Sequence, residues 1–156
     1  MLSGASAGLY RVQAEGGDAH EVNSYQTLSG YAGVVIGGGQ TLTVNLAGAP
    51  GEADGQGAKI NNLMGSTGSS LVVNNTGDST AVVILNNKQI ETGEDDIDPA
   101  GQDTVMGGSI TGGSNVTFIK EGIGALTVGG KMNVETLVLR EGSIVLNGAE
   151  NSLDTL

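Results

Sequence analysis

Hydrophobic and polar residues alternate along this chain with a period of two, in short stretches that recur over most of its length. Each stretch is bounded by Gly, Asn, Asp or Ser, which favour turns and positive φ angles. No stretch has the convincing 3.6-residue periodicity of a helix. The pattern predicts an all-β chain with strands at residues 41–46, 70–74, 81–85, 115–119, 125–128, 135–139 and 143–146.

The spacing of these strands indicates how they are connected. In the C-terminal third, successive strands begin about ten residues apart, so two strands with their turns make a repeat of roughly twenty residues, a length typical of solenoids. Asn pairs at 61–62, 74–75 and 86–87 suit the corners of such a coil, because Asn tolerates a left-handed bend and stacked Asn side chains hydrogen-bond to one another. The spacing favours a parallel β-helix. An antiparallel β-sandwich or barrel, whose strands have a similar spacing, is the alternative.

We expect residues 1–156 to form a single β-solenoid unit. Residues 1–33 are less repetitive and are predicted to be an irregular opening or edge region, and residues 34–156 are predicted to form the repeated rungs. Two stretches interrupt the repeat: "AGAPGEADGQG" at 47–57, and "ETGEDDIDPAGQD" at 91–103, which is strongly acidic. Both are predicted to be surface loops.

Composition and charge limit the classes of function. The chain has 28 Gly, no Cys, no Trp and only 3% aromatic residues, so its core must be built mainly from Val, Leu, Ile and Ala. Six Lys and Arg against 17 Asp and Glu give a net charge of -11. This balance argues against binding to nucleic acid or to an anionic membrane surface. No apolar run is long enough for a transmembrane helix, and the N-terminal residues lack the pattern of a signal peptide.

The segment from Lys120 to Gly148 resembles the autotransporter-associated β-strand repeat, which occurs in the passenger regions of Gram-negative type V secreted proteins. The middle of the segment departs from the family pattern, because "KMNVETLVLRE" (131–141) replaces the usual turn. The residues that match the repeat are Lys120, Gly122, Gly124, Leu126, Thr127, Val128 and Gly130 in its first half, and Gly142, Ile144, Leu146 and Gly148 in its second half.

The resemblance implies a right-handed parallel β-helix that is held outside the cell and has no activity of its own. The chain would be a structural stalk or passenger segment of a surface autotransporter, either secreted or anchored in the outer membrane of a Gram-negative bacterium through a translocator absent from this sequence. It would present loops for adhesion or aggregation to ligands on host or neighbouring cells. As an excised piece of passenger, it is expected to self-associate end to end through its last rung. The residues expected to face the core, at least in alternate positions, are Leu126, Val128, Leu137, Leu139, Ile144 and Leu146.

A catalytic triad has one candidate arrangement in the sequence. The segment "TGDST" (76–80) resembles the surroundings of a protease nucleophile, and Ser79 follows His20 and Asp54 in the chain. However, Thr80 stands where that motif has Gly, so a turn between two strands is the better interpretation. We assign no catalytic residue and no cofactor, and we expect that the chain is not an enzyme.

The acidic stretch contains the only candidate metal ligands. Asp96, Asp98 and Asp103 resemble the beginning of a Ca²⁺-binding loop, in which carboxylate oxygens surround the ion. Ala100 and Gly107 occupy the fifth and twelfth positions of that loop, where the EF-hand pattern needs oxygen ligands. A solvated acidic loop without bound metal is therefore the favoured interpretation.

Glycan cleavage is the alternative function, because some parallel β-helices are polysaccharide hydrolases or lyases. Glu91, Glu94 and Asp95 would supply the paired carboxylates that such chemistry needs. The chain has few aromatic or basic residues to line a sugar-binding groove, and this shortage favours the structural role.

Overall fold

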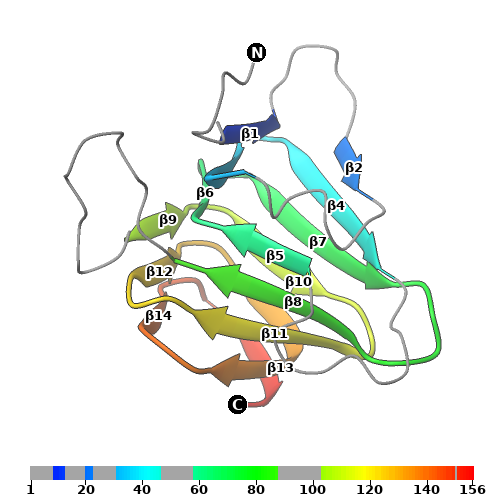
Figure 1. Cartoon of the computed structure of the whole chain (residues 1–156). Coiled ribbons are helices and arrows are strands. Elements are labelled where there is room, and N and C mark those ends of the chain that lie inside the picture. Colours follow the sequence, from blue (N-terminus) through cyan, green and yellow to red (C-terminus); the bar gives the residue numbers. More distant parts are fainter. Residues whose placement is uncertain (1–8, 13–19, 23–30, 47–57, 88–102, 150) are drawn as a thin grey trace.

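The computed structural model describes residues 9–12, 20–22, 31–46, 58–87, 103–149 and 151–156 (Figure 1). This part of the chain forms β-strands and no helix, so it has no helix able to span a membrane. The strands are β1 (Leu9–Val12), β2 (His20–Val22), β3 (Gly33–Ile36), β4 (Thr41–Leu46), β5 (Ala58–Asn61), β6 (Leu63–Gly65), β7 (Ser70–Asn75), β8 (Ala81–Asn86), β9 (Thr104–Met106), β10 (Ser109–Gly112), β11 (Val116–Glu121), β12 (Ala125–Val128), β13 (Met132–Leu139), β14 (Ser143–Leu146) and β15 (Ser152–Thr155).

The strands form two curled sheets. The six-stranded sheet has the order β1-β3-β6-β9-β12-β14, and the larger sheet has the order β2-β4-β7-β10-β13-β11-β8-β5, with β15 beside β13. The long strand β13 joins two arms of the larger sheet, because its first residues pair with β10 and its last residues pair with β11. Every strand pair in the described residues is parallel. The antiparallel sandwich is therefore wrong for this part of the chain.

Parallel pairing brings together segments that follow one another along the chain. Leu126 pairs with Thr104 on one side and with Ile144 on the other. The numbering of these partners agrees with the predicted repeat of roughly twenty residues. Earlier in the chain, the separation in sequence between register partners is longer: Leu71 pairs with Leu42 before it and with Ile110 after it. The longer steps contain the two stretches that were predicted to be loops.

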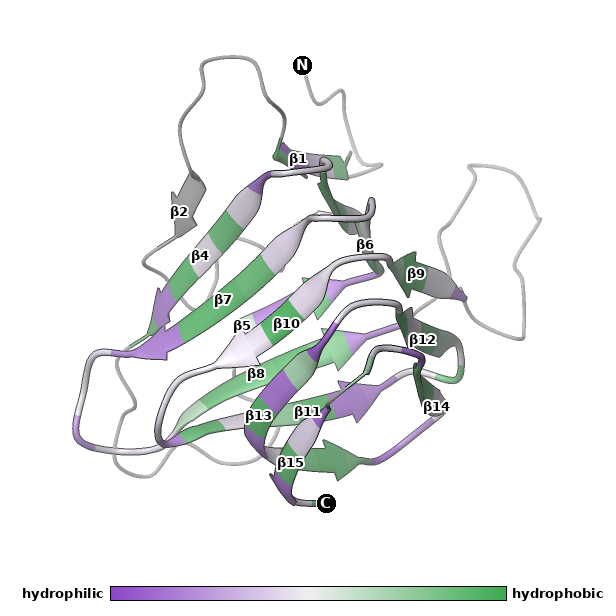
Figure 2. Ribbon diagram, turned by 180° about the vertical axis from the view of Figure 1, so that it is seen from behind, coloured by the Kyte–Doolittle hydropathy of each residue, from purple (hydrophilic) through white to green (hydrophobic). Residues whose placement is uncertain are grey.

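The core lies between the sheets and consists mainly of aliphatic side chains from alternate positions, together with Phe118, Met106 and Met132. In β4 the side chains of Leu42, Val44 and Leu46 are buried, and those between them are half-buried. Leu71 and Val73, the register partners of Leu42 and Val44 in β7, are also buried, so Leu42 lies beside Leu71 in the core. Figure 2 shows this alternation as bands of different hydropathy along β4, whereas the middle of β7 is continuously hydrophobic. Like side chains thus stack from strand to strand, as small β-branched and aliphatic residues favour.

Strand β8 is buried on both faces. Its residues 81–85 are all buried, and this agrees with the continuous apolar run in the sequence. Val82 and Ile84 point away from the main core and form a second small cluster with Ile119 of β11.

The sequence pattern located β4, β7, β8, β11, β12, β14 and the last five residues of β13, and it missed the other strands, which have three or four residues each. The predicted strands at 41–46, 125–128 and 143–146 coincide with β4, β12 and β14. Short strands such as β6 and β9 have too few residues for alternation to be recognised. Two other short strands, β1 and β2, lie within residues 1–33 and pair in parallel with β3 and β4, so this region contributes strands to both sheets. Residues 47–57 and 91–102, where the loops were predicted, lie outside the described residues.

The predicted core residues of the C-terminal part are buried to different extents. Leu126, Val128 and Leu137 are fully or almost fully buried, as predicted. Leu139 lies in the same column as the buried Leu85 and Lys120, but it is itself 49% exposed. Leu139 ends β13, beyond the residues that pair with β15, so no further described strand covers it. Ile144 and Leu146 in β14 are half-buried for the same reason, because β14 is the last strand of the six-stranded sheet.

Truncating Leu126 to Ala should lower the free energy of unfolding by about 2–5 kcal/mol, because it opens a cavity in the core. Leu139→Ala is the matched control, since it removes the same atoms from a half-exposed position and should cost clearly less. Denaturant unfolding of both variants checks this expectation. Equal losses would contradict the assignment of Leu126 to the core.

Candidate functional site

Most of the buried polar side chains lie at one corner of the fold. There the chain passes from β5, β8 and β11 of the larger sheet to β6, β9 and β12 of the six-stranded sheet. We call this group the polar corner, and it consists of Asn61, Asn62, Asn87, Thr104 and Lys120. Each is at most 4% exposed. In the part of the chain that the structure describes, the other buried polar residue is Ser69, in the turn between β6 and β7. A buried polar group must find a hydrogen-bond partner, so these residues carry the chemistry that holds the corner together.

Two neighbouring asparagines make the first level of the polar corner. Asn61 Nδ2 donates to the carbonyl oxygen of Tyr31 at 2.9 Å, and Asn62 Nδ2 donates to that of Ala32 at 2.8 Å. Asn62 has a φ of 48°, as predicted for an Asn at a bend. Its Oδ1 is buried and has no hydrogen-bond partner among the described residues, so Asn62 is held through its donor.

Asparagine side chains also connect successive strands, as the Asn pairs in the sequence predicted. Asn86 Nδ2 donates to Oδ1 of its register partner Asn61 at 3.0 Å. Between β4 and β7, Asn74 Nδ2 donates to Oδ1 of Asn45, also at 3.0 Å, and these two residues are register partners as well. Each bond links the two strands through side chains as well as through the backbone.

Asn87 makes the second level of the polar corner. Its Nδ2 donates to Thr104 Oγ1 at 2.8 Å and to the carbonyl oxygen of Ala125 at 3.3 Å. These partners lie at the beginnings of β9 and β12. One side chain therefore fixes the point at which the chain enters two neighbouring strands of the six-stranded sheet.

Lys120 makes the third level and is the charged member. Its side chain is fully buried, in the inward column where its register partners are Leu85 and Leu139. Its Nζ donates to the carbonyl oxygens of Glu121 at 2.6 Å, Gly122 at 2.9 Å and Glu141 at 3.4 Å. The ammonium group thus binds carbonyls of two successive turns of the chain.

The carboxylates around Lys120 only partly offset the effect of burial on its pKa. Burial lowers the pKa of Lys120, while the carboxylates of Glu141, Asp103 and Glu121 act in the opposite direction. On the surface above the corner, Arg140 and Glu121 form an ion pair with 2.9 Å between Nη1 and Oε1. The folded state accommodates the ammonium through backbone carbonyls, and no carboxylate hydrogen-bonds to it directly among the bonds that the structure describes.

Two glycines allow the turns at this corner to stack. Gly122 has a φ of 78° and Gly142 a φ of 69°, a region that favours Gly. A Cβ atom at Gly122 would overlap the carbonyl oxygen of Asn87, and one at Gly142 would overlap that of Gly122. The backbone of each turn therefore lies directly on the turn before it, with no room for a side chain.

Of the three triad candidates, the structure describes the surroundings of Ser79 alone. Asp54 and the side chain of His20 lie outside the described residues. The segment around Ser79 is a turn: Asn75 Nδ2 donates to the Ser79 carbonyl oxygen at 2.7 Å, and Asn75 Oδ1 accepts from the Gly77 amide at 2.9 Å. These bonds agree with the interpretation of this segment as a connection between β7 and β8.

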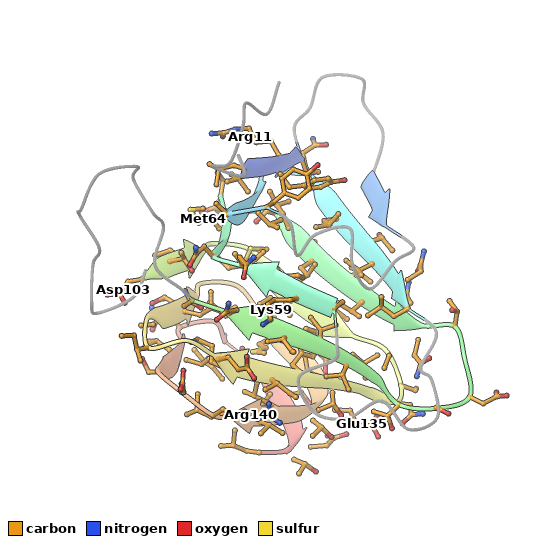
Figure 3. All side chains as sticks on the ribbon, viewed as in Figure 1. Arg11, Lys59, Met64, Asp103, Glu135 and Arg140 are labelled. Carbon is orange, nitrogen blue, oxygen red and sulfur yellow. The ribbon has the colours of Figure 1, made fainter. Side chains whose placement is uncertain are left out.

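Of the acidic candidates, Asp103 alone lies within the described residues. Asp96 and Asp98 lie outside the described residues, as do all of the carboxylates proposed for glycan cleavage (Glu91, Glu94 and Asp95). Asp103 is exposed, and its Oδ1 accepts a hydrogen bond from the Ala125 amide at 2.8 Å. Figure 3 places Asp103 and Glu135 on opposite sides of the molecule. No group of three His, Asp or Glu side chains that could hold a metal ion occurs within the described ranges.

Sequence reasoning overlooked Lys120 as a buried group, although the residue was noted as part of the repeat. A signal was present: Lys120 is in the same alternation phase as Val116 and Phe118, whose side chains are buried in the core. A lysine in the inward phase of a strand indicates that its side chain points toward the core.

Gly122→Ala should destabilise the fold more than Gly39→Ala. Gly39 also has a positive φ, of 74°, but a Cβ atom there would meet nothing within 4 Å. Its replacement should therefore cost only the backbone strain of about 1–2 kcal/mol. At Gly122 the same strain adds to a collision with the Asn87 backbone. Chemical unfolding of the two variants measures the difference, and equal losses would mean that the turns do not stack closely.

Comparison with known proteins adds no relative to this picture. No protein-family model matches the chain, and no curated protein or solved structure matches it either.

Proposed function

We propose that this chain is a structural segment of a surface-exposed passenger region, folded as a right-handed parallel β-helix with about twenty residues per rung where no loop intervenes. In this role the stacked strands are a scaffold. They hold the loops at 47–57 and 91–103 away from the cell for adhesion or aggregation. Ligands would be surface molecules of host or neighbouring cells.

One observation carries the proposal: the two halves of the repeat-like segment occupy equivalent places in successive strands. Leu126 of the first half is the register partner of Ile144 in the second half, and Val128 is the partner of Leu146. The turn glycines Gly122 and Gly142 stack in the same way. Residues matched by sequence alone thus coincide in space, as successive rungs of a β-helix require.

The composition supports export. A chain without Cys forms no disulfide that would prevent it from passing through a membrane unfolded. Parallel stacking lets each strand pair with one already formed, so the chain can fold progressively once outside. The Gram-negative cell surface is the location that this mode of folding and the sequence resemblance favour together.

Antibodies against this chain should label intact cells that make its complete reading frame, because the proposed location is outside the outer membrane. External protease should remove the label, and an antibody against a periplasmic protein should label only permeabilised cells. Labelling of this chain only after permeabilisation would contradict the proposal.

The isolated 156-residue chain should also self-associate through its C-terminal strands, as expected from the sequence. Beyond β14, and beyond the last residues of β13, the described residues offer no further strand. Leu139 is 49% exposed there, whereas Val12 and Ile60 near the opposite end are fully buried. Apolar surface and unpaired backbone on one edge favour association.

The net charge of -11 opposes this association and salt screens the repulsion, so light scattering should show association that increases with protein concentration and with salt. Val145→Lys, which adds a charge to an exposed position of β14, should weaken it. A monomer at all concentrations and salt levels would contradict the expectation.

A further inference from the structure

The outer face of strands β4, β7 and β10 is a neutral array of small side chains, most of them polar. These three strands contain no charged residue, although the chain carries a net charge of -11. Figure 2 is seen from the side of these strands, and no other described strand lies in front of them. The outward side chains at the centre of this face are those of Thr41, Thr43, Ser70, Val72, Ser109 and Thr111.

The parallel register places these side chains on a regular grid. Two columns of register partners run across the strands: Thr41, Ser70 and Ser109 in one, and Thr43, Val72 and Thr111 in the other. Neighbours within a column are about 4.8 Å apart, and the two columns are two residues, or about 6.7 Å, apart along the strands. Between the columns lie the fully buried Leu42, Leu71 and Ile110. The grid therefore rests on a packed core, which keeps its spacing fixed.

Most hydroxyl groups of the grid have no protein partner. Within the described residues, the hydroxyls that make no hydrogen bond are those of Thr41, Thr43, Ser70 and Thr111. Ser109 differs, because its Oγ accepts a bond from the Lys131 amide at 3.2 Å. A hydroxyl both donates and accepts hydrogen bonds, as a water molecule does. The grid thus offers a set of evenly spaced groups that can each replace one water molecule.

The chemistry of the grid limits the surfaces that it can bind. It has no charge to attract an ionic ligand, and no aromatic ring to stack against a sugar. Its hydroxyls would lose their hydrogen bonds against an apolar surface. The surface that fits is uncharged and has oxygen atoms that also repeat in two directions. Ice is such a surface, because its water oxygens form an array with repeat distances of similar size in two perpendicular directions.

We propose that the outer face of β4, β7 and β10 binds ice. The hydroxyls of the grid take the places of water molecules in the outermost layer of the crystal and exchange hydrogen bonds with that layer. Each bond is weak, but a rigid array loses little conformational freedom on binding, so its bonds act together. The inference goes beyond the scaffold role, because the stacked strands themselves are the binding surface, and it does not depend on where the protein resides.

Slow freezing tests the proposal, because a growing ice front excludes ordinary dissolved proteins and takes up those that bind to it. The chain should be enriched in the ice relative to the remaining liquid. Thr43→Lys, which places a long charged side chain on the grid, should abolish this enrichment. Thr127→Lys is the matched control, because Thr127 is also half-buried but points outward from β12, between its register partners Val105 and Val145 in the other sheet. It should leave the enrichment unchanged.

Denaturant unfolding of the variants establishes that each is folded, and Ser70→Lys, in the other column, takes the place of Thr43→Lys if that variant is not. Exclusion of the unchanged chain from ice would overturn the proposal, and so would equal enrichment of the grid variant and the Thr127→Lys control. Crystalline cellulose provides the test for a different occupant. A chain that is excluded from ice, sediments with cellulose and loses this binding with Thr43→Lys has a glycan-binding face, and that result also overturns the proposal.

Discussion

Parallel pairing between segments about twenty residues apart is the constraint on which the rest of this structure depends. Leu126 can lie beside both Thr104 and Ile144 only if the chain changes direction several times within each repeat and returns to the same place. Each change of direction is made in a few residues, so backbone groups are buried close to one another at the corners. The apolar core follows easily from such stacking, because each inward position repeats above its predecessor. The corners are the difficult part, and they contain most of the buried polar groups of the described residues.

At each level of the polar corner, a different side chain hydrogen-bonds to the buried polar groups. Asn62 bends the chain in a left-handed conformation and binds a carbonyl of the preceding segment. Asn87 hydrogen-bonds to the first residues of β9 and β12, and Lys120 hydrogen-bonds to backbone carbonyls of two turns. Asn is short and neutral, so it satisfies neighbouring carbonyls at little desolvation cost. A buried ammonium costs more, and it makes the fold depend strictly on the positions of the carbonyls around it.

These features suit the scaffold function that we propose. Stability in a stack of this kind is distributed over many similar contacts between neighbours, so a segment can be extended by repeating the same corner and the same inward residues. Outward positions and inserted stretches are then free to vary. The long steps between Leu42, Leu71 and Ile110 are examples, because insertions between those strands leave the parallel register intact.

The sequence alone determined that the described part of the chain forms β-strands, where seven of them lie, and that the C-terminal repeat is about twenty residues long. These properties depend on alternation and on turn residues, which act over a few neighbouring positions. It also indicated that Asn pairs would form ladders, which Asn61 and Asn86 do. The tertiary structure decided which strands pair, that β13 serves both arms of the larger sheet, and that Leu139 remains half-exposed while Lys120 is buried. Burial at a given inward position depends on whether another strand covers it, and the carbonyls that bind an ammonium group come from turns distant in sequence. Neither is visible in a local pattern of hydrophobic and polar residues.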